Sequence, residues 1–197
     1  RMFMICSYID HVEYRVMSGI IDESDAGSLF LAVRPDAERA ARMYRFADIL
    51  RRARNFQVTL IRSQRLHITL FFLGGWPEHI VRMACEAAAE IKTPPFDVSF
   101  DRTASFKGRP GNHAFVLLGD SGLNRLAAFR QMLGAAMTKN GLRQWAKPDF
   151  TPHVTLLYDR RKVEEQPIEP VSWTVREFVL IHSRHGHTHL ARWPLRG

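Results

Sequence analysis

The chain has 197 residues, of which 46% are hydrophobic, and a formal net charge of +8. This length suits a single compact domain with a substantial core, and no run approaches the roughly 18 apolar residues that a membrane helix needs. The two cysteines, Cys6 and Cys85, belong to no CxxC pair, which argues against a disulfide framework and a cysteine-based zinc site. We therefore expect a cytoplasmic protein with an anionic partner.

Hydrophobic periodicity and helix breakers define the expected elements. Residues 1–27 have a mixed pattern and are expected to be an N-terminal extension of uncertain order, followed by a single domain over 28–197. Within the domain we expect, in chain order, a strand at 29–33, a helix at 36–53, a strand at 67–73, a helix at 77–91, strands at 96–103 and 113–118, a helix at 123–140, a strand from 153, a loop over 160–170, and strands at 173–182 and 188–193. The order strand, helix, strand occurs twice, which is typical of a duplicated α+β fold.

One motif also occurs twice: His67 and Thr69 lie two positions apart in an apolar run, and so do His153 and Thr155. Alternate side chains of a strand point to the same face, so each histidine shares a face with its threonine while the apolar neighbours point to the core. If two such strands faced one groove, their imidazoles could act on opposite sides of one substrate atom. A general base facing a general acid is what in-line phosphoryl chemistry needs.

A second group of histidines lies near the C-terminus. The spacing of His185, His187 and His189 would place three imidazoles on one face of a strand, a plausible adventitious site for a transition metal. Three ligands from one strand lack the usual geometry of a catalytic metal site, so we favour the interpretation without a metal.

The chain resembles the RNA 2',3'-cyclic phosphodiesterases, also called bacterial 2'-5' RNA ligases, of the two-histidine phosphoesterase superfamily. The resemblance extends over residues 28 to 197. It rests on four segments: 28–33 with Pro35, 65–74 around the first motif, 150–153 leading into the second, and 186–195 at the end. A single His-x-Thr would be weak, but two copies in this context are specific. The resemblance implies a bilobal α+β fold, with two antiparallel-rich sheets flanked by helices around a central groove with pseudo-twofold symmetry.

The resemblance also implies an activity, the hydrolysis of 2',3'-cyclic phosphate ends of RNA to a 2'-phosphate. We expect His153 to activate water and His67 to protonate the leaving oxygen, although the sequence leaves the opposite order open. Thr69 and Thr155 would donate hydrogen bonds to the nonbridging oxygens. This scheme needs no metal and no cofactor, and the same groups could join a 5'-hydroxyl to a 2',3'-cyclic end and form a 2'-5' linkage. We expect a monomer that acts on RNA ends and does not bind membranes.

Two aromatic residues follow the motifs. Phe72 matches an aromatic residue of the family that could stack on a base, or it could be a core residue beside Phe71. Tyr158 stands where many relatives carry an arginine that contacts the substrate. Three other arginines could replace that cation: Arg65, Arg109 and Arg160.

Positive charge is concentrated in one stretch. Residues 34–65 contain nine arginines against three acidic residues, a local net charge of +6. This stretch could attract a phosphate-bearing polymer, or it could be the solvated face of a helix.

Two other functions remain open. The same site could act on 2'-5' oligonucleotides or on a cyclic phosphate of ADP-ribose. Alternatively, the protein could be a basic module that binds RNA ends without turnover.

Overall fold

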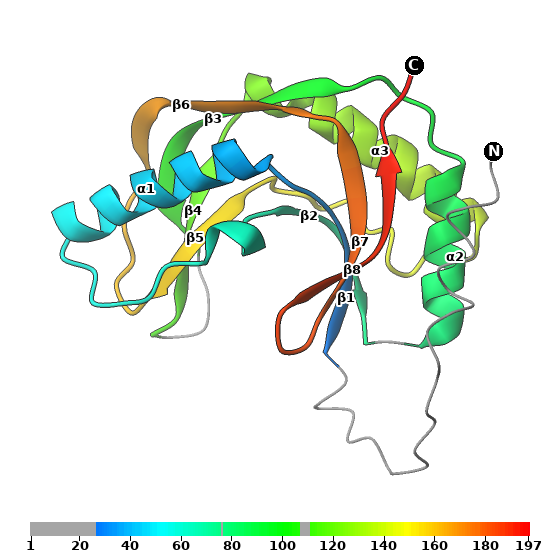
Figure 1. Cartoon of the computed structure of the whole chain (residues 1–197), viewed down its shortest axis with the longest axis horizontal. Coiled ribbons are helices and arrows are strands. Elements are labelled where there is room, and N and C mark those ends of the chain that lie inside the picture. Colours follow the sequence, from blue (N-terminus) through cyan, green and yellow to red (C-terminus); the bar gives the residue numbers. More distant parts are fainter. Residues whose placement is uncertain (1–26, 76, 107–110) are drawn as a thin grey trace, which may run out of the picture.

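The computed structural model describes residues 27–75, 77–106 and 111–197. They form two four-stranded antiparallel sheets and three α-helices (Figure 1), so the predicted α+β class is confirmed. Most of the expected N-terminal extension, and Arg109, lie outside the described residues. Within them, no helix is both long and apolar enough to cross a membrane.

The strand order is similar in the two sheets. The first sheet has the order β2-β1-β7-β8 and the second has the order β5-β4-β3-β6. The first contains β1 (Ser28–Val33), β2 (Ile68–Gly74), β7 (Glu177–Ser183) and β8 (His187–Pro194). The second contains β3 (Phe96–Ser105), β4 (His113–Leu118), β5 (Val154–Asp159) and β6 (Gln166–Val175). The strand that follows each motif histidine lies at the edge of its sheet. This strand is β2 after His67 and β5 after His153.

The helices lie close to the predicted ranges. They are α1 (Ala37–Ala53), α2 (Glu78–Ala89) and α3 (Asn124–Lys139). Asp36 caps α1, because its carboxylate accepts a hydrogen bond of 2.8 Å from the backbone N–H of Arg39. Gly141, with φ of +85°, follows α3 in the left-handed conformation that glycine adopts readily. Local sequence signals therefore mark where α1 begins and where α3 ends.

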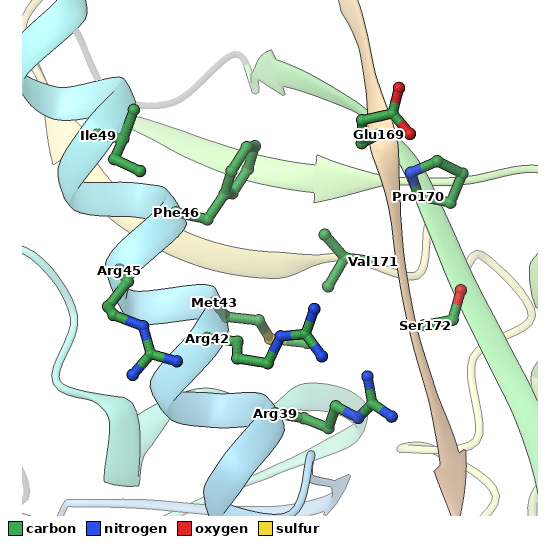
Figure 2. Close-up of a pocket in the computed structure, with 10 residues that line it drawn as sticks. All are labelled: Arg39, Arg42, Met43, Arg45, Phe46, Ile49, Glu169, Pro170, Val171 and Ser172. Atoms are coloured by element: carbon green, nitrogen blue, oxygen red, sulfur yellow. The ribbon is translucent and has the colours of Figure 1, made fainter.

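Strand β6 differs from the prediction. The prediction of a loop over 160–170 is wrong, because β6 begins at Gln166. The prediction of a single strand over 173–182 is also wrong, because the chain passes at Arg176 from β6 into β7 of the other sheet. Pro167 and Pro170 suggested a loop. An edge strand accommodates proline, since only one of its sides must supply the full ladder of hydrogen bonds. The free side of β6 lies beside α1 (Figure 2).

Most of the interior is one hydrophobic core to which both sheets and all three helices contribute. The opposite faces carry two smaller clusters of buried side chains. One consists of Phe30, Ala32, Val179 and Ile181 on the first sheet, and the other of Ala104, Val116 and Leu118 on the second, with Phe106 packed against it. Each sheet therefore has a second apolar face on which further side chains can rest.

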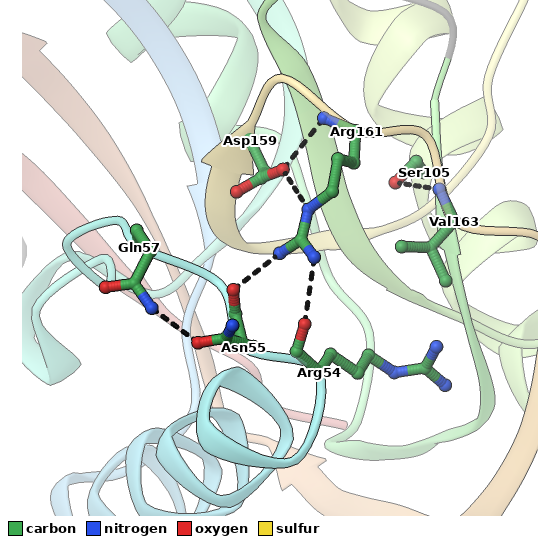
Figure 3. Close-up of polar contacts among 7 residues, drawn as sticks. All are labelled: Arg54, Asn55, Gln57, Ser105, Asp159, Arg161 and Val163. Carbon is green, nitrogen blue, oxygen red and sulfur yellow. Dashed lines mark hydrogen bonds and ion pairs between the residues drawn. The ribbon is translucent and has the colours of Figure 1, made fainter.

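Arg161 connects the end of α1 to the end of β5 (Figure 3). Its guanidinium donates hydrogen bonds of 3.0 Å to the carbonyl oxygens of Arg54 and Asn55 and pairs with the buried carboxylate of Asp159 at 3.1 Å. The guanidinium of Arg161 also lies 4.6 Å from the ring centre of Phe56. These contacts satisfy carbonyls at the helix C-terminus, which have no partner within the helix.

Candidate active site

The two motif histidines occupy equivalent places in the two sheets. His67 directly precedes β2, and His153 directly precedes β5. Each following strand pairs on one side only, β2 with β1 and β5 with β4. The sequence repeat is therefore also a repeat in the fold.

The two strands share an irregularity that the sequence did not indicate. The pairing register skips Leu70 in β2 and Leu156 in β5, so each strand contains a bulge one residue after its threonine. The burial patterns along the two strands agree at every shared position. A bulge shifts the alternation of side chains by one residue.

As a result, the residue five positions after each histidine is exposed. Phe72 is 57% exposed and Tyr158 is 47% exposed, whereas Phe71 is 3% exposed and belongs to the core. Of the two neighbouring phenylalanines, Phe72 is thus the one available to a ligand. Thr69 and Thr155 are both half-buried.

Each imidazole is held by a hydrogen bond of the same kind. Nδ1 of His67 donates to the carbonyl oxygen of Arg65 at 2.7 Å, and Nδ1 of His153 donates to that of Thr151 at 2.7 Å. A carbonyl only accepts, so Nδ1 carries a proton in each ring and Nε2 is left for chemistry. In the first motif, Nε2 of His67 also lies 3.1 Å from Oγ1 of Thr69.

Burial is the main reason that the pKa of each histidine is lowered. For His67 the backbone hydrogen bond raises the pKa, while the charges of His153, Arg34 and Arg65 lower it further. For His153 burial lowers the pKa and the hydrogen bond to Thr151 raises it. Because the charge of His153 acts on His67, the two imidazoles lie within electrostatic reach of each other.

An aromatic ring supports each histidine. The ring of Phe30 stacks on His67 with centres 5.0 Å apart, and Phe106 contacts His153 edge to face at 4.7 Å. Both phenylalanines belong to, or pack against, the small clusters on the second faces of the sheets. These apolar faces hold the imidazoles in place.

His187 is a neighbour of His67 that the sequence analysis did not select for the active site. Its ring lies edge to face against His67 with centres 5.1 Å apart, and against Phe30 at 5.6 Å. Burial lowers the pKa of His187 to about 4, with further lowering by the charges of His67 and nearby arginines. His187 is therefore neutral at physiological pH.

The C-terminal histidines do not converge. His189 lies between two arginines, with Nε2 3.0 Å from Arg34 and Nδ1 2.8 Å from Arg192, and His185 is exposed. Burial and these two charges lower the pKa of His189 to about 4. Among the residues that the structure describes, no group of three His, Cys, Asp or Glu side chains could hold a metal ion.

A cavity of about 680 Å³ opens beside the motifs. Sites for small ligands usually have volumes of roughly 300 to 1,000 Å³. The lining of this cavity includes Thr69, Phe72, His153 and the exposed Lys147. Lys147 forms no side-chain hydrogen bond or ion pair with a described residue. It is therefore a candidate for the cation that Tyr158 does not supply.

The other candidate cations lie in different places. Arg65 is exposed next to His67 and its charge lowers the pKa of that histidine. Arg160 is exposed just beyond β5. Of these two arginines, only Arg65 has an electrostatic connection to the motif histidines.

Buried Arg130 of α3 joins the two motif regions. It donates hydrogen bonds to the carbonyl oxygens of Leu70 at 3.0 Å, Lys147 at 2.6 Å and Pro148 at 3.1 Å. Its guanidinium lies between two phenylalanine rings, 4.3 Å and 4.4 Å from their centres. Leu70 is the bulge residue of β2, and 147–148 lead into the second motif, so one side chain fixes both. No local signal indicated this role, since an arginine in a helix is usually exposed.

A model of the 2'-5' RNA ligase superfamily matches residues 35–187. The chain belongs to this superfamily. The resemblance inferred from the two motifs is thereby confirmed.

Two named proteins have similar sequences. A protein named RNA 2',3'-cyclic phosphodiesterase from Escherichia coli K12 is 30% identical over 146 residues, which cover 68% of this chain and 78% of that protein. A protein of the same name from Archaeoglobus fulgidus is 30% identical over 108 residues, or 55% of this chain; the match spans 60% of that protein's length.

Solved structures of similar sequence have the same fold. E. coli LigT complexed with 3'-AMP is 27% identical, with a TM-score of 0.64, and the match covers 87% of this chain and 99% of LigT. TT0787 of Thermus thermophilus, at 24% identity, has a TM-score of 0.65 over 86% of this chain and 98% of that one, which supports the fold. The bilobal two-histidine arrangement expected from the sequence is confirmed.

Proposed function

We propose that the protein hydrolyses 2',3'-cyclic phosphate ends of RNA to 2'-phosphates, with His67 and His153 as a general acid and base pair. The observation that carries the proposal is the matched pair of imidazoles, each with Nδ1 bound to a backbone carbonyl; Nε2 of His67 meets Oγ1 of Thr69 in the free site. Two groups of this kind provide both proton transfers that opening of a cyclic phosphodiester needs. The names of the two sequence relatives support this substrate.

In the proposed reaction, His153 removes a proton from water as the water oxygen attacks phosphorus. The bond between phosphorus and the 3'-oxygen breaks, and His67 delivers its proton to that oxygen. The ribose then carries a 3'-hydroxyl and a 2'-phosphate, and the two histidines have exchanged protonation states. The scheme uses only protons held by imidazoles, so it requires no metal and no cofactor.

Hydroxyl and cationic groups stabilise the charge that develops on phosphorus. Thr69 and Thr155, each two residues after a histidine, donate hydrogen bonds to the nonbridging oxygens. Lys147, which lines the same cavity as Thr69 and His153, provides a positive charge. Such groups raise the rate when they bind the transition state more tightly than the substrate.

Two exposed aromatic side chains hold the terminal nucleoside. Phe72 lines the cavity, and Tyr158 occupies the equivalent position in β5. Rings in these positions can stack on a base. The solved complexes of LigT with ATP and with 3'-AMP support a nucleotide-sized ligand.

The same groups can open the ring with a nucleophile other than water. A 5'-hydroxyl in place of water would attack the cyclic phosphate and form a 2'-5' linkage. Water is present at far higher concentration, so hydrolysis is the main activity that we propose. A 2'-5' oligonucleotide or a cyclic phosphate of ADP-ribose is the alternative substrate, and binding without turnover is the alternative function.

The test is incubation of the protein with a short RNA that ends in a 2',3'-cyclic phosphate, with EDTA present, and separation of 2'- from 3'-phosphate products. We expect a 2'-phosphate from the wild type and a loss of at least about 100-fold in rate for His67→Ala and for His153→Ala. Unchanged binding of the RNA by both variants would show that the loss is catalytic. A wild-type rate in either variant would overturn the two-histidine mechanism.

A further inference from the structure

The arginine-rich stretch from 34 to 65 divides into two groups in the structure. Several of its arginines have polar partners within the chain: Arg51 and Arg52 pair with Asp48 at 2.8 Å, and Arg54 bonds to Gln166. Arg39, Arg42 and Arg45 are different. Their guanidinium groups form no hydrogen bond or ion pair with any residue that the structure describes. Their charge is available to a partner.

These three arginines line a groove between α1 and the free side of β6. The groove has a volume of about 340 Å³. Figure 2 shows Arg39 and Arg42 extending from α1 toward β6. Glu169 is the only acidic residue of this lining, so the groove has an excess of positive charge.

The floor of the groove is apolar. Met43 is buried, while Phe46 of α1 and Val171 of β6 are half-buried and face each other across it (Figure 2). Ile49, which also lines the groove, is 65% exposed. A cationic rim over an aromatic and aliphatic floor provides both contacts that single-stranded nucleic acid uses, because phosphates bind arginine and bases stack on aromatic rings.

The spacing of the arginines suits an extended chain of phosphates. They lie three residues apart along α1, so successive arginines are separated by about 4.5 Å along the helix axis. This is similar to the distance of roughly 3.4 Å between successive nucleotides of a stacked strand. An acidic peptide would also meet the charge, but it would not use the ring of Phe46 in the same way.

The groove is separate from the candidate active site. None of its lining residues contributes to the cavity beside Thr69 and His153. Arg34 lies between the two sites in the sequence: its charge acts on His67, and α1 begins three residues after it.

We propose that this groove binds the single-stranded RNA that precedes the cyclic phosphate end, an inference that rests on the proposed function. Arg39 and Arg42 contact phosphates, and Phe46 packs against a base. The groove increases the affinity for long RNA without taking part in the reaction. Short substrates end before they reach it.

The experiment compares two substrates in the full-length chain and in the double variant Arg39→Gln/Arg42→Gln. One substrate is a dinucleotide that ends in a 2',3'-cyclic phosphate, and the other is a single-stranded RNA of about 20 nucleotides with the same end. For the long RNA we expect KM to rise roughly tenfold with kcat unchanged, and the slope of log affinity against log salt to decrease by about 1.4, or about 0.7 for each lost contact. The dinucleotide should be hydrolysed as by the wild type.

The double variant Arg82→Gln/Arg125→Gln is the matched control. It removes the same charge from exposed positions on α2 and α3. An equal loss of affinity in this control would mean that only the net charge matters, and it would overturn the groove. So would an unchanged KM for the long RNA in Arg39→Gln/Arg42→Gln.

Failure of the proposed function would look different. If the wild type does not open the dinucleotide, the hydrolysis proposal is wrong. The groove is then tested by fluorescence anisotropy with a single-stranded RNA of about 20 nucleotides that carries a 3'-hydroxyl. A salt slope that is equal in the wild type and in Arg39→Gln/Arg42→Gln would reject RNA as its ligand and leave an acidic protein segment as the candidate.

Discussion

The two halves of the candidate active site have the same backbone but different surroundings. Each contains an edge strand with a bulge, a histidine whose Nδ1 binds a carbonyl two residues earlier, and a supporting phenylalanine. Around His67, however, the structure adds a hydrogen bond to Thr69, the ring of His187 and the charge of Arg34. The repeated backbone thus sets where the imidazoles lie and burial lowers the pKa of both, while unrepeated charges lower the pKa of His67 further.

The largest expected effect comes from breaking the connection between the halves. Arg130→Met keeps most of the apolar stem but removes the donors to the carbonyls of Leu70, Lys147 and Pro148. Carbonyls that lose a buried donor destabilise the fold, and we expect a decrease of about 3 kcal/mol in the free energy of unfolding, measured with urea. Arg161→Met is the control, because its guanidinium also binds two carbonyls but is half exposed. A loss for Arg130→Met no larger than that for Arg161→Met would contradict the role of Arg130.

The next effect tests whether the two threonines are equivalent. Thr69→Val and Thr155→Val each remove one hydroxyl with little change in shape, and we expect kcat to decrease about 100-fold in both, as for the loss of one transition-state donor. Single-turnover rates measure this decrease. Only Thr69→Val should also alter the pH dependence, since only Thr69 bonds to its histidine in the free site. A higher KM at constant kcat would assign the hydroxyls to substrate binding instead.

His187 belongs to the His67 half alone, so its removal should affect only that half. We expect His187→Ala to decrease kcat about tenfold, because a histidine that is less well held is oriented for reaction less often. His187→Phe preserves the ring against His67 and should recover most of the rate. Since the pKa of His187 is about 4, neither variant should remove an ionisation near neutral pH. Equal losses in the two variants would point to a role for the imidazole nitrogens and reject simple packing.

The sequence predicted much of this arrangement, but only where the information is local. The start of α1 followed from Asp36 and the end of α3 from Gly141, and the repeated His-x-Thr predicted two matching strands. Strict alternation could not predict the bulges, because extra residues in a ladder depend on the partner strand. Hence the sequence alone could not decide whether Phe72 is exposed or belongs to the core.

The rest of the site depends on contacts between distant parts of the chain. Arg130 contacts Leu70 across 60 residues, and His187 contacts His67 from the last strand. Neither is marked by a motif. The prolines of β6 were a misleading local signal, since their tolerance depends on an edge that only the sheet order reveals.

The smallest effect distinguishes the acid from the base. The charge of Arg34 lowers the pKa of His67, so Arg34→Gln should raise that pKa. An acid must be protonated to act, and a base must be neutral. If His67 is the acid, as proposed, the high-pH limb of kcat therefore moves to higher pH; if it is the base, the low-pH limb moves instead.

Arg192→Gln is the control for that shift. Arg192 also contacts His189, but its charge is not among those that lower the pKa of His67. Its removal should leave both limbs of the pH profile in place. The charges around His67 in the free site favour the neutral imidazole, which is the form that a base needs. A shift of the low-pH limb in Arg34→Gln would show that His67 is the base and His153 is the acid. A shift of the high-pH limb would instead mean that the substrate phosphate, which is negative, raises the pKa of His67 enough to keep it protonated.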